Sequence, residues 1–407
     1  MSVQELRTPQ KTSQRRKRGK TVGVLPSQRL QVALDEGWIR SPYTTPPSSI
    51  QPASLDLRLG RSAYALRCSF LPMRGCPVMK RVEELTLHTV DIRDGATLEL
   101  DRPYLIPLVE ELELPHYVQA KANPKSSTGR LDVFTRVITD GNNRFDDIPA
   151  GYKGRLYLEV VPRSFAVHVH ELMSLNQLRL SQGDARVKDS ALRALHAESF
   201  PLLYLGDQPV PTDDLDISDG LFLSVDLRGP SEIVGYRAKK SSHRIDLARI
   251  RHYDWRDYWE PVYPEPGGRV VLTPETFYLL LSAEGVCVPP EYAAEMMAYD
   301  PTAGELRTHY AGFFDPGFGY SRDQQQLGSR AALEVRARDV PFMIEHGQPI
   351  CKLAFESMLE EPDRLYGEDV NSNYQGQMTM LSKHFTEQNA GRDAARGPVS
   401  PSAPSLF

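Results

Sequence analysis

The chain of 407 residues is 40% hydrophobic and 25% charged, so it is long and apolar enough for two or three domains, each with its own core. No apolar run approaches the roughly 20 residues that cross a bilayer, and the basic N-terminus lacks the apolar segment of a secretory signal. With a net charge of only −5, we expect a cytoplasmic enzyme or binding protein with neither nucleic acid nor membrane as a partner.

Local composition predicts disorder at both ends of the chain, and apolar spacing predicts the first helix. Residues 1–21 form a basic arm and residues 388–407 a polar tail, and both are predicted to be disordered. Between them, apolar spacing indicates a short helix that starts at Ser27 and ends near Gly37. Alternating segments such as residues 54–59 and 155–160, together with 32 prolines, favour strands and turns elsewhere.

The cysteines indicate no covalent or metal framework. None of the four belongs to a CxxC pair, and Cys287 and Cys351 lie in apolar, strand-like runs. We therefore expect reduced thiols that act as small hydrophobic side chains, and no zinc site.

Three segments of the chain recur in the same order. Asp56 in SLDLR matches Asp226 in SVDLR, Tyr104 matches Tyr278, and Glu159 in LEV matches Glu334 in LEV, at offsets of 170, 174 and 175 residues. A repeat of this length predicts two copies of one domain of ordinary size. We assign the first domain to residues 22–207 and the second to residues 208–387.

Residues 125–130 (KSSTGR), the serine motif, are the sharpest local feature. Consecutive hydroxyls, with Lys125 before them and Arg130 after them, suit a phosphate group. The spacing of a P-loop is absent. Taken alone, such a run is also typical of a solvated turn.

Glu159 is the second candidate. It follows a tight turn at residues 151–154 and shares a strand face with Arg155 and Tyr157. An exposed strand carboxylate would look the same. Because Glu334 occupies the matching place in the second copy, however, a shared structural or catalytic role is favoured.

Together, residues 51–60 (QPASLDLRLG), 125–130 (KSSTGR) and 151–159 (GYKGRLYLE) resemble dCTP deaminase, a family within the dUTPase-like superfamily. Residues 314–319 (FDPGFG) resemble that family's Asp-Pro-Gly turn, and the likeness covers most of residues 22–380. The resemblance implies an all-β fold: two tandem dUTPase-like domains, each a distorted β-barrel or jelly roll, with a few short helices.

The resemblance also implies an activity, the hydrolytic deamination of dCTP to dUTP and ammonia without zinc. Glu159 matches the family's general base, and Ser126 and Arg130 match the residues that position the water and the base. Lys125, Ser126 and Ser127 would hold the triphosphate. Mg²⁺ would bridge phosphate oxygens rather than occupy a protein cage.

Further substrate-binding residues follow from the same resemblance. Tyr366, Tyr374 and Gln377 match a closing segment that folds over the phosphates, although Asn373 stands where a lysine is common. Lys125 similarly replaces an arginine of the serine motif. Asp146 and Asp315 are candidates for the family's sugar-contacting aspartate, and either residue also suits a turn.

The second copy reads DPTAGE at residues 300–305, where the paired serines and the arginine are missing. Because family members are usually trimers with sites between subunits, we expect a homo-oligomer, either a trimer or a pseudo-trimeric assembly. If the two domains alternate around a ring, Glu334 would face the serine motif, but the turn before Glu159 favours Glu159.

Two other functions stay open at this stage. The same fold serves dUTP diphosphatases and enzymes that combine both steps. The degenerate second copy also keeps open a non-catalytic nucleotide-binding protein.

Overall fold

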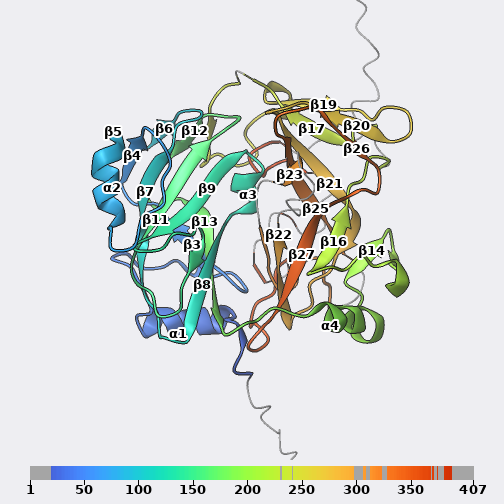
Figure 1. Cartoon of the computed structure of the whole chain (residues 1–407), viewed down its shortest axis with the longest axis horizontal. Coiled ribbons are helices and arrows are strands. Elements are labelled where there is room, and N and C mark those ends of the chain that lie inside the picture. Colours follow the sequence, from blue (N-terminus) through green and yellow to red (C-terminus); the bar gives the residue numbers. More distant parts are fainter. Residues whose placement is uncertain are drawn as a thin grey trace, which may run out of the picture.

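The computed structural model describes residues 20–229, 232–240, 242–297, 306–308, 312–322, 328–367, 369–370, 374 and 380–386. Figure 1 shows two β-rich units side by side, with short helices at their margins. The predicted all-β fold is confirmed. Among the described residues, no helix is long and apolar enough to cross a membrane. All four cysteines are described and free, with Cys287 and Cys351 buried.

The first unit packs two sheets around one core. The predicted short helix is α1 (Ser27–Asp35), and Gly37 follows it with a φ of +76°. One sheet contains β1 (Gly23–Val24), β13 (Ser174–Gln182), β8 (Val118–Pro124), β10 (Asp147–Ile148) and β3 (Leu55–Arg58). The other contains β5 (Thr86–Asp91), β4 (Ser62–Leu66), β7 (Tyr104–Glu113), β11 (Lys153–Pro162), β9 (Val133–Thr139) and β2 (Ile39–Arg40).

The second unit repeats this plan. One sheet contains β15 (Gln208–Pro209), β14 (Leu203–Leu205), β21 (Phe277–Val286), β17 (Gly235–Ala238), β19 (Trp259–Val262), β25 (Ser329–Ala337) and β23 (Leu306–Thr308). The other contains β16 (Leu221–Ser224), β27 (Pro349–Ser357), β22 (Tyr292–Met297) and β24 (Phe313–Phe314), and β20 (Arg269–Leu272) pairs with β26 (Phe342–Glu345).

Short helical turns lie between these strands. They are α2 (Val78–Leu85), α3 (Ser126–Gly129), α4 (Asp189–Ala194) with a π-helical turn at Leu195–Ser199, and 3₁₀ turns at Pro47–Ser49, Thr212–Asp214 and Trp255–Asp257.

The boundary between the units lies earlier than the predicted one at 207/208. Leu192 of α4, Leu202 and the first residue of β14, Leu203, are buried in the core of the second unit, and β14 pairs with β21. The apolar side chains of residues 189–205 therefore assign this segment to the second unit.

Equivalent strands of the two units pair in the same register. Glu159 of β11 pairs with Leu105 of β7, and Glu334 of β25 pairs with Leu279 of β21. The hydroxyl of Tyr104 accepts a hydrogen bond from the backbone N–H five residues earlier, and that of Tyr278 does the same (3.2 and 2.9 Å). The predicted pairs Tyr104/Tyr278 and Glu159/Glu334 are therefore structurally equivalent.

A continuous apolar interface joins the two units. Phe277 and Leu279 of β21 belong to the same buried cluster as the core of the first unit. The rings of Phe165 and Trp259 meet edge to face across the interface at 5.1 Å. Strand β18 (Ile245–Asp246) of the second unit pairs in parallel with β12 (Val167–Val169), which also pairs with β6 (Ala96–Leu98). Burial of this apolar surface fixes the relative position of the units.

Buried ion pairs set the register of this interface. Arg336 of β25 pairs with Asp132, and their side chains are 8% and 1% exposed. Arg179 of β13 contacts Asp315 and Glu356 of the second unit, each at 3.0 Å. Such pairs position surfaces because removing one partner leaves a buried charge uncompensated.

We expect Asp132→Asn to lower the free energy of unfolding by about 3 kcal/mol or more, because Arg336 would lose its buried counter-charge. The exposed inter-unit pair Arg29–Glu360 provides the control, with side chains 53% and 37% exposed. Glu360→Gln should cost less than about 1 kcal/mol. Urea unfolding measures both variants, and equal losses would contradict the assignment of the Asp132–Arg336 pair.

Candidate active site between the two units

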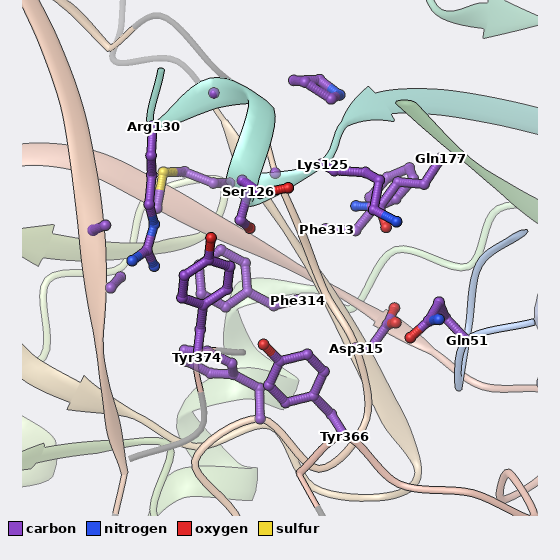
Figure 2. Close-up of a pocket in the computed structure, with 18 of the residues that line it drawn as sticks. Gln51, Lys125, Ser126, Arg130, Gln177, Phe313, Phe314, Asp315, Tyr366 and Tyr374 are labelled. Carbon is purple, nitrogen blue, oxygen red and sulfur yellow. The ribbon is translucent and has the colours of Figure 1, made fainter. Parts of the chain in front are cut away.

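A cavity of about 360 Å³ lies at the interface and takes side chains from both units. Figure 2 shows Ser126 and Arg130 on the α3 side of this pocket, with Tyr366, Tyr374 and Asp315 across from them. The first unit contributes Ser48, Gln51, Asp56, Pro124, Lys125, Ser126, Ser127, Gly129, Arg130 and Gln177. The second contributes Met296, Gly312, Phe313, Phe314, Asp315, Phe318, Ala331, Ala332, Glu334, Tyr366, Tyr374 and Lys383.

The serine motif forms a single helical turn, α3, at the end of β8. The carbonyl of Lys125 accepts hydrogen bonds from the N–H groups of Thr128 and Gly129 (2.8 and 3.0 Å). This turn lies at the boundary between the two units (Figure 1) and directs the side chains of Ser126 and Arg130 into the pocket. The structure thus brings Ser126 and Arg130, two of the predicted site residues, to one pocket.

Glu334 of β25 faces the serine motif from the other unit. A Cβ atom added at Gly129 would lie 2.5 Å from Oε2 of Glu334, so the carboxylate packs directly against this glycine. Burial raises the pKa of Glu334 well above its ordinary value, the charge of Arg130 opposes that shift, and Asp132 adds to it. The pocket therefore contains a buried carboxyl group beside an arginine.

Glu159, in contrast, does not line the pocket. Its side chain is fully buried and forms an ion pair with Arg136 of β9. The guanidinium of Arg136 in turn stacks on Phe134 and Phe145, 4.5 and 3.7 Å from the ring centres. The expectation that Glu159 faces Ser126 and Arg130 is thus not met within this chain, where Glu334 takes that place.

The difference arises from what covers two equivalent strand faces. Leu279, beside Glu334, packs into the interface with the first unit. Its equivalent Leu105, beside Glu159, packs into a cluster with Val78 and Val82 of α2. Helix α2 lies on the side of the first unit away from the second (Figure 1). In the first unit a helix therefore covers the strand face that, in the second unit, packs against the first.

Asp315, and not Asp146, lines the pocket. Asp315 accepts a hydrogen bond from Arg179 at 3.0 Å, and burial raises the pKa of its carboxyl. Asp146 instead accepts a hydrogen bond from the backbone N–H of Val137 at 2.7 Å, in a turn with a φ of +61°. Asp146 is therefore a turn residue outside the pocket, the alternative already considered from the sequence.

The turn that positions Asp315 has a counterpart in the first unit. The N–H of Phe318 bonds to the carbonyl of Asp315 at 3.1 Å, and the N–H of Tyr152 bonds to that of Pro149 at 3.2 Å. Val288 and Leu114 then bond to the carbonyls of Phe318 and Tyr152. Pro149 thus stands where Asp315 stands, so the first unit has no aspartate at this turn.

Of the other predicted substrate-binding residues, four line the pocket and one lies outside the described residues. Lys125 forms an ion pair with Asp56, and both side chains line the pocket. Ser127 is buried beside it. The ring of Tyr374 lies 3.8 Å from the guanidinium carbon of Arg130, and Tyr366 lies close by (Figure 2). Gln377, with Asn373 and the second copy's residues 300–305, lies outside the described residues.

Several pocket residues were missed by the sequence reasoning. Gln51 and Asp56 lie in residues 51–60, which resemble the dCTP deaminase family, so this resemblance could have identified them as site residues. Gln177 and the pair Phe313 and Phe314 have only ordinary strand patterns. Lys383 follows the predicted closing segment and had no local signal at all.

The charged side chains of the pocket do not resemble a metal site. Within the described ranges, no three His, Cys, Asp or Glu side chains gather closely enough to hold a metal ion. Asp56 and Asp315 are each already engaged by a cation, Lys125 and Arg179 respectively.

Comparisons with known proteins agree with this architecture. Family models of the N-terminal and C-terminal domains of 2′-deoxycytidine 5′-triphosphate deaminase match residues 21–184 and 188–385. A crystal structure of this deaminase from Agrobacterium tumefaciens has a TM-score of 0.79 and 43% identity, and it covers 84% of this chain and 100% of its own. The chain belongs to the dCTP deaminase family.

Two curated relatives match over shorter stretches. One is the dCTP deaminase of Natronomonas pharaonis, 29% identical over 177 residues, which are 42% of this chain and 83% of the relative. The other is a dUMP-forming dCTP deaminase of Methanosphaera stadtmanae, 24% identical over 177 residues, which are 42% of this chain and 84% of the relative.

The structural role of Asp146 predicts a pH effect on stability. Burial raises the pKa of Asp146 to about 7 from 3.8, so the folded chain binds more protons than the unfolded chain between these values. Its contribution to stability is therefore complete below pH 3.8 and is lost as the pH rises through about 7. An asparagine tolerates the positive φ and still accepts the Val137 bond.

Asp146→Asn should therefore match the native chain in thermal midpoint at about pH 4 and exceed it at about pH 8. Asp147→Asn is the matched control, since that side chain is 48% exposed. If the difference in thermal midpoint between Asp146→Asn and the native chain does not grow with pH, the carboxyl of Asp146 does not bind a proton in the folded chain over this range.

Proposed function

We propose that the chain hydrolyses dCTP to dUTP and ammonia in the pocket between its units, with Glu334 as the general base. The observation that carries the proposal is the approach of Glu334 to the serine motif, where its carboxylate lies against Gly129 beside Ser126 and Arg130. Membership of the dCTP deaminase family supports the substrate and the reaction class.

The reaction needs one group that both accepts and donates protons. As a water oxygen attacks C4 of cytosine, the Glu334 carboxylate takes one water proton and passes it to N3. The remaining hydroxyl proton then moves through the same carboxylate to the amino nitrogen. The C4–N bond breaks, ammonia leaves, and C4 becomes a carbonyl. All atoms of water and dCTP are then accounted for in dUTP and ammonia.

The environment of Glu334 suits both roles. Burial favours the protonated carboxylic acid, and the charge of Arg130 favours the ionised form. A carboxyl group under these two opposing influences suits a residue that both accepts and donates protons. In this proposal Ser126 holds the attacking water, and Arg130, fixed by the ring of Tyr374, orients Glu334 and the base.

The remaining groups would bind the substrate. Lys125 and the hydroxyls of Ser126 and Ser127 suit the triphosphate, and Asp315 suits a hydroxyl of the sugar. Mg²⁺ would arrive on the phosphate oxygens, because Asp56 and Asp315 already contact Lys125 and Arg179.

A second candidate is an enzyme that also cleaves dUTP to dUMP. Two of the relatives are named dUMP-forming dCTP deaminases, from Methanosphaera stadtmanae and Methanothermobacter thermautotrophicus, the latter 27% identical over 141 residues. Measuring pyrophosphate in parallel with ammonia separates the two. Ammonia without pyrophosphate supports dUTP as the product, and equimolar release supports dUMP.

The first prediction of this proposal concerns the two equivalent glutamates. We expect Glu334→Gln to lower kcat for ammonia release by about 10²- to 10⁴-fold, because an amide cannot accept the water proton. The matched control is Glu159→Gln, which leaves Arg136 without its counter-charge and so should lower the thermal midpoint. Measured on folded protein, its kcat and kcat/KM should stay within about twofold of the native values because this side chain lies outside the pocket. Loss of activity in Glu159→Gln alone would overturn the assignment of the base.

A second prediction concerns the pH dependence of kcat/KM. Because the pKa of Glu334 is raised and the base acts in its ionised form, kcat/KM should rise with pH and the midpoint of this acid limb should lie well above 4.5. Arg130→Gln removes the charge that opposes the shift, so the limb of its residual activity should move to higher pH. A limb at or below 4.5 in the native chain would contradict this placement of the base.

A further inference from the structure

Arg179 is a buried arginine of the first unit whose side chain is anchored in the second unit. It lies on β13, and its side chain is 2% exposed. Nη1 donates to the carbonyl of Ala294 and to Oε2 of Glu356, both at 3.0 Å. Nη2 donates to the carbonyl of Phe314 at 3.4 Å and to Oδ1 of Asp315 at 3.0 Å. One side chain of the first unit therefore holds β22, β27 and the turn after β24.

Arg179 lies behind the wall of the pocket. It does not belong to the described side chains that line the cavity, whereas Phe313, Phe314 and Asp315 do. The guanidinium carbon of Arg179 lies 4.0 Å from the ring centre of Phe313. Because side chains two residues apart on a strand share a face, β13 presents Gln177 to the pocket and Arg179 beside it, to the residues that form the wall. Arg179 therefore acts on a ligand through the second-unit residues that it holds.

The contact with Arg179 leaves one carboxylate oxygen of Asp315 open to a ligand. Oδ1 accepts from Arg179, whereas Oδ2 lies 3.5 Å from the hydroxyl of Ser54, at the long limit for such a bond. Burial raises the pKa of Asp315, the charge and hydrogen bond of Arg179 lower it, and the charge of Asp56 raises it further. Burial alone would favour the protonated acid. Arg179 thus favours the ionised form, which can only accept hydrogen bonds.

The repeat shows that this arrangement occurs on one side of the interface. Arg179 pairs with Lys121 across β13 and β8, and Ala354 pairs with Glu295 across β27 and β22. Lys121 and Glu295 are 174 residues apart, the offset that also relates β7 to β21. Ala354 therefore occupies in the second unit the place of Arg179 in the first. Since the first unit also has a proline in place of the aspartate, the equivalent position has lost both partners of the ion pair.

We propose that Arg179 is a positioning residue that sets the preference of this pocket for a sugar with a free 3′-hydroxyl. The inference rests on the proposed function, in which Asp315 contacts a sugar hydroxyl, and goes further by naming the residue that fixes this contact. In dCTP the 5′-oxygen carries the triphosphate and C2′ carries no hydroxyl, so the 3′-hydroxyl is the one that Asp315 can meet. Arg179 holds Oδ1, and Oδ2 accepts a hydrogen bond from that hydroxyl.

The alternative is a purely structural role, in which Arg179 only joins the two units. The two roles differ in how the effect depends on the sugar. A structural arginine affects dCTP and 2′,3′-dideoxycytidine triphosphate equally. A positioning arginine affects the substrate that carries the 3′-hydroxyl and leaves the dideoxy analogue nearly unchanged.

The test measures kcat and KM for both triphosphates in Arg179→Gln, Arg179→Lys and the native chain. Dissociation constants are measured by calorimetry with each change made in the Glu334→Gln chain, so that turnover is slow. Lys121→Gln is the matched control, because Lys121 lies opposite Arg179 in the sheet and pairs across the interface with Glu295 at 2.8 Å. Neither residue of that pair lines the pocket. Thermal midpoints check that each variant is folded.

We expect the native chain to prefer dCTP to the dideoxy analogue in kcat/KM. Arg179→Gln should reduce this preference about tenfold, mainly by raising KM for dCTP, since one charge-assisted hydrogen bond is lost. Its kcat/KM for the dideoxy analogue should stay within about twofold of the native value. Arg179→Lys keeps the charge without the planar fork and should reduce the preference about threefold. Lys121→Gln should keep the native preference.

An unchanged preference in either folded Arg179 variant, or equal kcat/KM of the native chain for the two triphosphates, would overturn the inference. If Arg179→Gln does not fold, the loss expected of Arg179→Lys decides. Failure of the proposed function has a different signature. In that case the native chain would release no ammonia from dCTP, while the ratio of the two dissociation constants would still report on Arg179.

Discussion

The site depends on one contact between the units, in which β25 lies against the corner formed by α3 and the start of β9. Arg336 pairs there with Asp132. Arg336 follows Glu334 by two residues, and Asp132 follows Arg130 by two residues; Glu334 and Arg130 both line the pocket. Because the side chains of a strand alternate, Glu334 and Arg336 share one face, and the buried Asp132–Arg336 pair fixes where Glu334 lies. Gly129 leaves the space that this carboxylate occupies.

The two copies of the domain have kept different parts of one site. The first retains the serine motif but has Pro149 where the second has Asp315, and its glutamate, Glu159, is held by Arg136 beneath α2. The second retains Glu334 and Asp315, and its sequence lacks the serines. Among the described residues, the pocket thus draws its side chains from both units, and the C-terminal segment reaches back to the serine motif through Ser382.

Much of this organisation could be predicted from the sequence. The repeat offsets identified β7 with β21 and β11 with β25, and the serine motif, which the sequence singled out, lines the pocket. The choice between Glu159 and Glu334 could not be made locally, because both follow the same alternating pattern on equivalent strands. The two glutamates differ in what packs on their strand face: α2 covers the face of Glu159, and the first unit covers that of Glu334. This packing depends on the tertiary fold and not on the local sequence. Lys383 was missed for a similar reason, because only the fold brings a lysine near the end of the chain to residues 125–130.

The central claim is that one chain contributes both halves of its site. Ser126→Ala lacks a pocket group of the first unit, and Glu334→Gln lacks the proposed base in the second. Ammonia release from dCTP by the two variants, co-expressed and purified together, tests the claim most directly. If each site lies within one chain, the mixture should be as inactive as the separate variants. Recovery of a substantial fraction of native activity would show that the halves come from different chains and would contradict this account.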